Sequence, residues 1–229
     1  MSGHATVHLR PHADVAERVL LPGDPGRALR LAQLLLDTPK MLNHNRGLWG
    51  YTGMAADGEP LTIQATGIGG PSAAIVCEEL IVLGARRLVR VGTCGALGAA
   101  ELGDLVIAES VLPEDGASRA LGADAPLAAD PALLAALRAA GDGAASGLVV
   151  SADLYYDPDP GRAERWIAAG ALAVEMEAAT ILAVAARHGA AAACVLTVSD
   201  LVASRERIGV EALELAEKRL GAVGAAAFG

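Results

Sequence analysis

The sequence is poor in aromatic residues, in cysteine and in positive charge. Aromatic residues make up 3% of its 229 residues, while 53% are hydrophobic and many of these are alanine. We therefore expect closely packed helices rather than an aromatic-rich core. The three cysteines, Cys77, Cys94 and Cys194, are widely spaced and odd in number, which fits neither a zinc pattern nor a disulfide framework. The net charge of −9 argues against a general nucleic-acid binder, although it permits a local cationic pocket.

An export signal and an uninterrupted membrane-spanning run are also missing. Residues 1–19 lack the apolar core of a signal peptide. The longest apolar stretch, 178–198, is broken by Arg187, His188 and Gly189, which is typical of a helix, a turn and a strand. We therefore expect a cytoplasmic protein with no membrane and no nucleic-acid partner.

Strands alternate with helices along the chain, which predicts an α/β fold with a largely parallel central sheet. Strands are expected at 18–22, 49–56, 60–66, 88–91, 104–111, 147–151, 171–174 and 192–198. Helices are expected after the loop Gly23-Asp24-Pro25 through about Leu36, at 71–84, 131–140, 161–169 and 176–188, and from about Ile208 to Ala222. Asp57-Gly58 predicts a hairpin turn, and 113–130 is expected to be a surface excursion. With no repeat and no linker, residues 1–229 are expected to form one domain.

Two glutamates, Glu175 and Glu177, interrupt an otherwise apolar run. Carboxylates are rarely buried without a partner. No Lys or Arg follows nearby in sequence before Arg187, so a local ion pair is not the obvious partner. A ligand rich in hydroxyl donors, such as a sugar, is the alternative.

A strand, a glycine loop and a helix start follow one another in residues 20–27. Free N–H groups at Gly23 and at the helix N-terminus favour an anion, and Arg27 can close over it from the first turn. Alternatively, Asp24 simply caps the helix.

Arg90 strengthens the case for an anion site, because a guanidinium within an apolar strand needs an anion or a carboxylate as partner. Thr93 adds a hydroxyl donor shortly after it, and Arg46 is either a third cation or a solvated loop residue. Forked donors together with backbone N–H groups suit phosphate. The Gly-Lys-Ser/Thr ending of a P-loop is absent.

These segments together resemble the nucleoside phosphorylase superfamily, and most closely the bacterial hexameric purine nucleoside phosphorylases. The resemblance runs from Ala5-Thr-Val-His8 to Glu206-Arg207. Its motifs, in order, are LPGDPGRA (21–28), NRGLWGYTG (45–53), TGIGGPSAA (66–74), VRVGTCGA (89–96), SADLYYDPD (151–159), AVEMEAA (173–179) and TVSD (197–200). It implies a single α/β domain whose mixed, largely parallel, twisted sheet or barrel is flanked by helices.

The resemblance also implies the composition of the site. The implied phosphate site contains Gly23, Arg27, Arg90 and Thr93, with Arg46 supplied by a neighbouring subunit. The implied nucleoside site contains His8, Cys94, Gly95, Tyr155, Val174, Glu175, Met176, Glu177 and Ser199. In it, Glu177 holds the ribose 2′- and 3′-hydroxyls, Met176 packs on the sugar, and His8 reaches the 5′-hydroxyl from a neighbouring subunit. The implied assembly is a homohexamer, a trimer of dimers.

The implied reaction is attack of phosphate on the anomeric carbon of a purine (deoxy)ribonucleoside, which releases the purine and (deoxy)ribose 1-phosphate. Asp200 is the implied general acid toward purine N7, so it must carry a proton at the working pH. General acid catalysis of this kind contributes about 10²–10⁴-fold. Arg207 is its implied partner, with Arg205 an adjacent candidate because the stretch after Asp200 is short. Alternatively, Ser199-Asp200 caps a helix.

Two further departures from the family pattern concern the ligand-facing groups. Thr93 stands where serine is common, which keeps the hydroxyl, and Tyr155 stands where phenylalanine is common, which adds one. Phosphate is expected as a co-substrate, with no cofactor and no metal. The histidines, His4, His8, His12, His44 and His188, form no HExxH-like set.

Three other functions remain as alternatives. A uridine phosphorylase would need an amide and a guanidinium to read uracil, whereas 151–159 offers tyrosines. A nucleosidase, which uses water, would not need Arg27 and Arg90 as a clamp. A non-catalytic nucleoside-binding protein should have lost the acid or a clamp arginine, yet Asp200, Arg27 and Arg90 are all present.

Overall fold

Ten strands and seven α-helices lie within residues 6–229, the part of the chain that the computed structural model describes. The strands are β1 (Arg18–Leu21), β2 (Leu36–Asn43), β3 (Gly50–Ala55), β4 (Pro60–Gln64), β5 (Arg87–Ala96), β6 (Leu105–Glu114), β7 (Leu127–Ala128), β8 (Ala145–Ala152), β9 (Ala171–Glu175) and β10 (Ala191–Leu201). The helices are α1 (Pro25–Leu35), α2 (Gly70–Val82), α3 (Gly116–Ala120), α4 (Pro131–Ala140), α5 (Arg162–Ala168), α6 (Ala178–His188) and α7 (Val210–Ala226), with a 3₁₀ turn at Asn45–Gly47. His4 lies outside the described residues.

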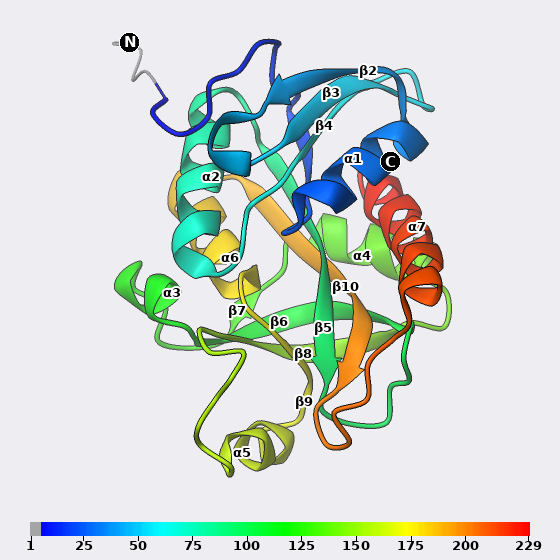
Figure 1. Ribbon diagram of the computed structural model, residues 1–229. Helices are drawn as coiled ribbons and strands as arrows, with labels where there is room; N and C mark the ends of the chain where they lie inside the picture. The colour runs from blue at the N-terminus through cyan, green and yellow to red at the C-terminus, as the bar shows by residue number, and fades with distance from the viewer. Residues whose placement is uncertain (1–5) are drawn as a thin grey trace.

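The strands form one mixed sheet, part of which closes on itself (Figure 1). β10 pairs with β5 along one edge and with β6 along the other, and β8 and β9 complete a ring back to β5. Outside the ring, β5 pairs with β1, and the sheet continues through β4, β3 and β2. The expected α/β architecture, a mixed twisted sheet or barrel with flanking helices, is confirmed. Because β1, β5 and β10 run parallel, their carboxyl ends meet at one edge.

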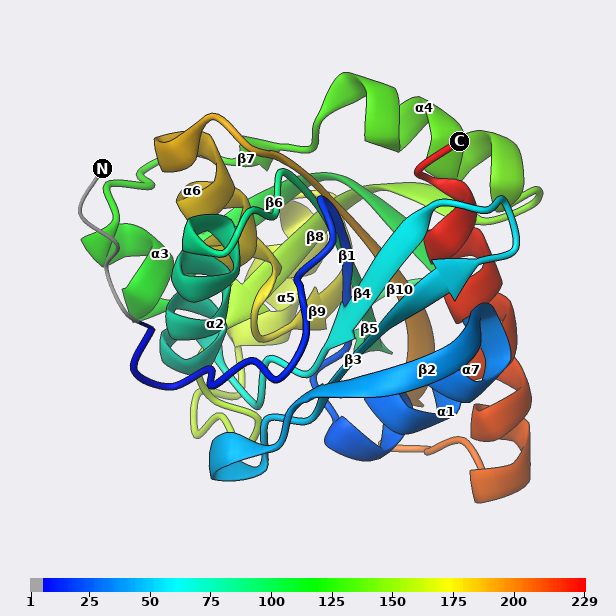
Figure 2. The same cartoon turned by 90° about the horizontal axis from the view of Figure 1, so that it is seen from above.

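Helices cover the sheet on two sides (Figure 2). Helices α2 and α6 contribute to one apolar cluster, which includes Val76, Leu80 and Ile181. Helices α1, α4 and α7 contribute to a second, and α5 contributes Trp166 to a smaller third. No helix within residues 6–229 combines the length and apolar character needed to cross a bilayer.

Small residues let α7 lie very close to its neighbours. A Cβ atom added at Gly224 would lie 2.4 Å from Val91 Cγ1, and one added at Gly221 would lie 2.3 Å from Leu31 Cδ2. Distances this short are far inside van der Waals contact, so both positions need glycine. The two glycines thus let α7 approach both β5 and α1 closely.

Two segments differ from the sequence prediction. Strand β2 was not predicted, because it is an edge strand with an exposed middle and contains Pro39, so it lacks the apolar alternation of a covered strand. Residues 113–130 are more than a surface excursion, since β6 extends to Glu114 and the short α3 follows. Within α3, Ser118 is fully buried and hydrogen-bonds to Asp115.

Candidate active site

The glycine loop after β1 is shaped by a helix cap. The Asp24 carboxylate accepts a hydrogen bond from the Arg27 backbone N–H at 2.6 Å, so the capping interpretation of Asp24 is confirmed. A Cβ atom added at Gly23 would lie 3.2 Å from the Gly67 carbonyl oxygen and 4.0 Å from Arg90 Nη1. Gly23 therefore lies beside the strand arginine, and in the sheet Leu21 at the end of β1 is the register partner of Arg90.

Arg90 is held between two carboxylates. Its side chain is almost fully buried, with Nε 2.7 Å from Glu175 Oε2 and Nη2 2.5 Å from Glu177 Oε2. Burial alone would lower the pKa of Arg90, but the charges of Glu177 and Glu175 outweigh it and raise that pKa. Nη1 has no hydrogen-bond partner within residues 6–229 and lies on the side of Gly23. A buried, permanently charged donor near the glycine loop therefore lacks a hydrogen-bond partner.

Gly92 provides the space for this guanidinium. A Cβ atom added there would lie 2.7 Å from both Cζ and Nη2 of Arg90. The Arg90 side chain therefore occupies the space that the missing side chain of Gly92 leaves free.

Glu175 has a structural set of partners. Its Oε2 accepts hydrogen bonds from the backbone N–H groups of Glu177 (2.8 Å) and Ala178 (2.9 Å), at the start of α6. Its Oε1 accepts a hydrogen bond from the Ser151 hydroxyl on β8. Together with Arg90, these contacts explain the burial of Glu175 without a ligand. The expectation that the partner is not local in sequence is confirmed, because the ion-pair partner, Arg90, comes from β5.

Glu177 is the second carboxylate and precedes α6 directly. Its Oε1 accepts the Gly69 N–H at 2.5 Å, while Oε2 contacts Arg90. Burial and the neighbouring Glu175 raise the pKa of Glu177, although Arg90, Gly69 and Arg27 oppose the shift. Each carboxylate oxygen can accept a second hydrogen bond, so Glu177 retains acceptor capacity for two hydroxyl donors.

Asp200 lies against the glycine of the neighbouring strand. Gly95 is the register partner of both Asp200 on β10 and Val174 on β9, and a Cβ atom added to it would lie 2.9 Å from Asp200 Oδ2. The Ser199 hydroxyl donates to Asp200 Oδ1 at 2.9 Å. Asp200 lies within β10 and the residue that caps α7 is Gly209, so the helix-cap alternative for Ser199-Asp200 is wrong.

Arg207 lies opposite Asp200 in a backbone β-bridge. The two residues form an antiparallel bridge, closed by a hydrogen bond from Ile208 N–H to the Ser199 carbonyl oxygen at 2.9 Å. Arg205 lies in the tight turn between them, with φ of 62°. Both arginines are exposed, and neither forms an ion pair within the described residues. Directly opposed residues of an antiparallel pair share a face, which favours Arg207 over Arg205 as the neighbour of Asp200.

Other predicted residues have different surroundings. Thr93 is half-buried on β5, opposite Thr197. Cys94 is buried, and its Sγ contacts the Thr197 carbonyl oxygen at 3.7 Å. Burial, followed by the charges of Glu175 and Asp200, raises the pKa of the Cys94 thiol. The side chain thus borders the site as a neutral, apolar group.

The predicted residues Arg46, His8, Tyr155 and Met176 form no hydrogen bond or ion pair with the side chains of Arg90, Glu175 and Glu177 within residues 6–229. Arg46 is exposed, with φ of 60°. His8 Nδ1 lies 2.9 Å from Glu79 Oε1 on α2. Tyr155 is 54% exposed and packs edge-on against Tyr156, and Met176 is half-buried.

Sequence reasoning missed the partner of Arg27. Arg27 Nε donates to Glu217 Oε1 on α7 at 2.7 Å, and both side chains are buried. The same carboxylate accepts from Arg30 at 2.5 Å. The spacing of Leu213, Glu217 and Leu220 places the acid on the inward face of α7, and this pattern could have revealed it.

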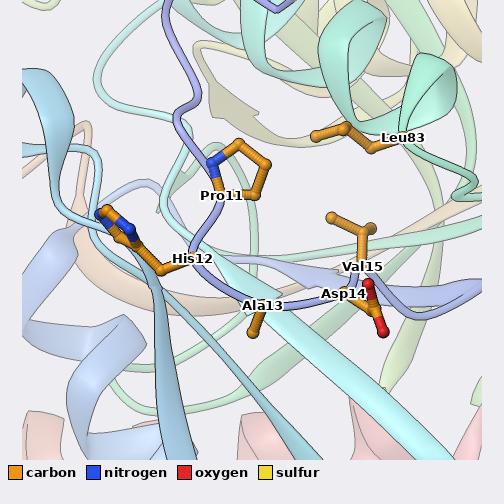
Figure 3. Close-up of a pocket in the computed structure, with 6 residues that line it drawn as sticks. All are labelled: Pro11, His12, Ala13, Asp14, Val15 and Leu83. Atoms are coloured by element: carbon orange, nitrogen blue, oxygen red, sulfur yellow. The ribbon is translucent and has the colours of Figure 1, made fainter.

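A separate cavity of about 530 Å³ lies away from these residues (Figure 3). Its lining consists of Pro11, His12, Ala13, Asp14, Val15 and Leu83. The His12 ring turns away from Val15 and Leu83 and stacks on His44, with 5.4 Å between ring centroids. None of the predicted site residues lines this cavity.

The fold and the strand-end cluster together define an α/β protein with a buried arginine beside two carboxylates. Residues 17–228 match the family model described as Phosphorylase superfamily, and the chain belongs to this family.

Three relatives show the similarity. The chain is 42% identical over 214 residues to a DeoD-type purine nucleoside phosphorylase from Jannaschia sp. (strain CCS1), covering 89% of this chain and 90% of the relative. It is 39% identical over 206 residues to a protein of the same name from Geobacillus kaustophilus (strain HTA426), covering 86% of each. It is 40% identical over 212 residues to a guanosine phosphorylase from Halorubrum lacusprofundi, covering 90% of this chain and 87% of the relative.

Proposed function

We propose that the protein catalyses phosphorolysis of purine (deoxy)ribonucleosides to the free purine and (deoxy)ribose 1-phosphate. The observation that carries this proposal is the position of Arg90. One side of its guanidinium holds Glu177, and the other leaves Nη1 unpaired beside Gly23. An anion at Gly23 and a sugar at Glu177 would therefore lie on either side of one fixed cation. The names of the relatives support the purine assignment.

The chemistry follows from these positions. Phosphate, held by Arg90, Arg27 and the N–H groups near Gly23, attacks the anomeric carbon while the bond to the purine nitrogen breaks. The sugar gains oxocarbenium character, which the adjacent phosphate charge stabilises, and Glu177 accepts hydrogen bonds from its hydroxyls. Asp200 donates a proton to purine N7, so that the base leaves as a neutral molecule. No cofactor is needed, because phosphate is the second substrate.

We also propose that the site is completed by a neighbouring subunit of a homohexamer, a trimer of dimers. Arg46 is exposed and makes no ion pair in the described part of its own chain. Nearby exposed apolar side chains support burial in an interface, since Ile68 is 80% exposed and directly precedes Gly69, the donor to Glu177. His8 would join from the same interface. A cytoplasmic location is supported by three cysteines that are all unpaired and buried.

Three alternatives have less support. A uridine phosphorylase would share the clamp, but the relatives that we compared carry the names of purine and guanosine phosphorylases. A nucleosidase would have no use for the unpaired Nη1 of Arg90. A non-catalytic binder would have no use for an acid held by Ser199.

The decisive experiment is to measure turnover of inosine, adenosine, guanosine and uridine with and without phosphate. We expect turnover of the purine nucleosides to require phosphate and to yield ribose 1-phosphate. Equal rates without phosphate would contradict phosphorolysis, and preferential turnover of uridine would contradict the purine assignment. The ratios of kcat/KM would then rank the purines.

Replacement of Asp200 tests the acid. In Asp200→Asn we expect inosine turnover to fall by about 10²–10⁴-fold, because the amide cannot deliver a proton to N7. Phosphate binding, measured by calorimetry, should persist. Unchanged inosine turnover would remove Asp200 from the mechanism.

A further inference from the structure

Glu217 is a buried carboxylate that the proposed reaction does not use. It lies on α7 and is 2% exposed, although a buried acid is costly without partners. Two arginines of α1 satisfy it: Arg27 Nε approaches Oε1 at 2.7 Å, and Arg30 approaches Oε2 through Nε at 3.0 Å and through Nη2 at 2.5 Å. Both carboxylate oxygens are thus occupied by guanidinium groups from one helix.

The contact constrains the orientation of Arg27. A guanidinium is planar, so fixing Nε on one side determines the direction of the two Nη groups. The side-chain hydrogen bond of Arg27 within residues 6–229 is the one from Nε to Glu217, so its Nη groups remain available. Arg27 also lies close enough to Glu177 for its charge to oppose the upward shift in the pKa of Glu177. The guanidinium of Arg27 therefore lies near Glu177, which contacts Arg90.

Arg30 supports the arrangement from the outside. Its side chain is 43% exposed, and its Nη2 also lies 3.8 Å from Asp24 Oδ2, the cap of α1. One arginine thus connects the helix cap with Glu217, so α1, its cap and α7 are held together around the glycine loop.

We infer that Glu217 is a positioning residue of the phosphate site, which holds Arg27 in the orientation that binds the anion. The inference rests on the proposed function, since it assigns a role relative to phosphate. Glu217 does not contact the substrate itself. It also couples the phosphate site to α7, the helix that follows Arg207.

The test is Glu217→Gln, with Glu214→Gln as the matched control, because Glu214 is an exposed acid on the same helix. We expect the Kd and KM for phosphate to rise between about tenfold and about a hundredfold in Glu217→Gln, as for loss of a buried hydrogen bond to a charged group. The KM for the nucleoside should remain unchanged, and Glu214→Gln should resemble the wild type. A purely structural role would instead lower Tm without changing the Kd for phosphate.

A second variant covers the case in which Glu217→Gln does not fold. Arg30→Gln alters the exposed end of the same contact, and we expect about a threefold rise in the KM for phosphate. Wild-type affinity for phosphate in Glu217→Gln, or in Arg30→Gln if the former is unfolded, would overturn the inference. Absence of phosphate binding by the wild type itself would instead contradict the proposed function. Calorimetry with inorganic phosphate alone separates these outcomes.

Discussion

At the scale of single residues, the site consists of charges that neutralise one another inside the protein. Arg90 contacts Glu175 and Glu177, and Arg27 contacts Glu217. Buried ion pairs contribute little net stability, because desolvation of the charges offsets their attraction. Their value here is geometric, since each guanidinium is held by one edge and offers its remaining N–H groups in a defined direction.

Replacing Glu177 should separate stability from activity. In Glu177→Gln we expect turnover to fall about a hundredfold, through weaker hydrogen bonds to the sugar. The free energy of unfolding at neutral pH should not fall. Burial of the charge raises the pKa of Glu177, and the neutral glutamine no longer buries a charge at this position. Kinetics and thermal unfolding check both expectations, and a clear loss of stability would contradict this view of the carboxylate.

The sign of the pH dependence follows from the same shift. The pKa of Glu177 is raised in the folded state above its ordinary value of 4.5, so the folded protein binds more protons than the unfolded chain between these two values. The contribution of Glu177 to stability is therefore complete below the ordinary value and declines as pH rises through the raised one. As the pH rises between these two pKa values, the unfolding free energy of the wild type should therefore fall relative to that of Glu177→Gln.

At the scale of elements, the parallel strands β5 and β10 assemble the site. Their register places Cys94 beside Val198 and Gly95 beside Asp200, with a bulge between the two pairs. Bulges redirect side chains near functional sites. Gly92 and Gly95 then leave room for Arg90 and for the Asp200 carboxylate, respectively. The two glycines of β5 are therefore required by side chains of the protein itself.

A methyl group at Gly92 should displace Arg90. In Gly92→Ala the new Cβ would lie 2.7 Å from Arg90 Cζ, so we expect a loss of about 1–3 kcal/mol in stability. The KM for phosphate should rise as well. Gly98→Ala is the control, since nothing lies within 4 Å of a Cβ at that exposed position. Wild-type behaviour of Gly92→Ala in unfolding and in kinetics would show that Arg90 tolerates the methyl group.

At the scale of the whole molecule, we propose that the site is divided between subunits. Glu177, Arg90 and Asp200 come from the core of one chain, whereas Arg46 lies exposed on the 3₁₀ turn between β2 and β3. An exposed arginine with left-handed backbone geometry gains little from its own chain. In an assembly it would add a third cation to the phosphate site of its neighbour.

Mixed assemblies test this division. Arg46→Ala and Asp200→Asn should each have little activity alone. When the two are co-expressed, some interfaces should combine the intact Asp200 of one subunit with the intact Arg46 of the other, and activity should reappear. Separately purified proteins that are mixed without subunit exchange are the control. If Arg46 acts within its own chain, co-expression will not restore turnover.

The sequence by itself determined much of this protein, because burial and turn chemistry are local properties. The alternation of strands and helices, the Asp57-Gly58 hairpin and the unusual acids Glu175 and Glu177 were all visible as breaks in periodic patterns. The order of the seven motifs indicated the family, which the match over residues 17–228 confirms. Strand β2 was not predicted from the sequence, because an exposed edge strand carries no apolar pattern.

Only the tertiary structure decided which charges meet. The partner of Glu175 and Glu177 is Arg90 from another strand, and the partner of Arg27 is Glu217, from the last helix. It also placed Arg207, rather than Arg205, opposite Asp200. A sequence pattern shows that a charge is buried, but the choice of partner depends on strand register and helix packing, which join residues far apart in the chain.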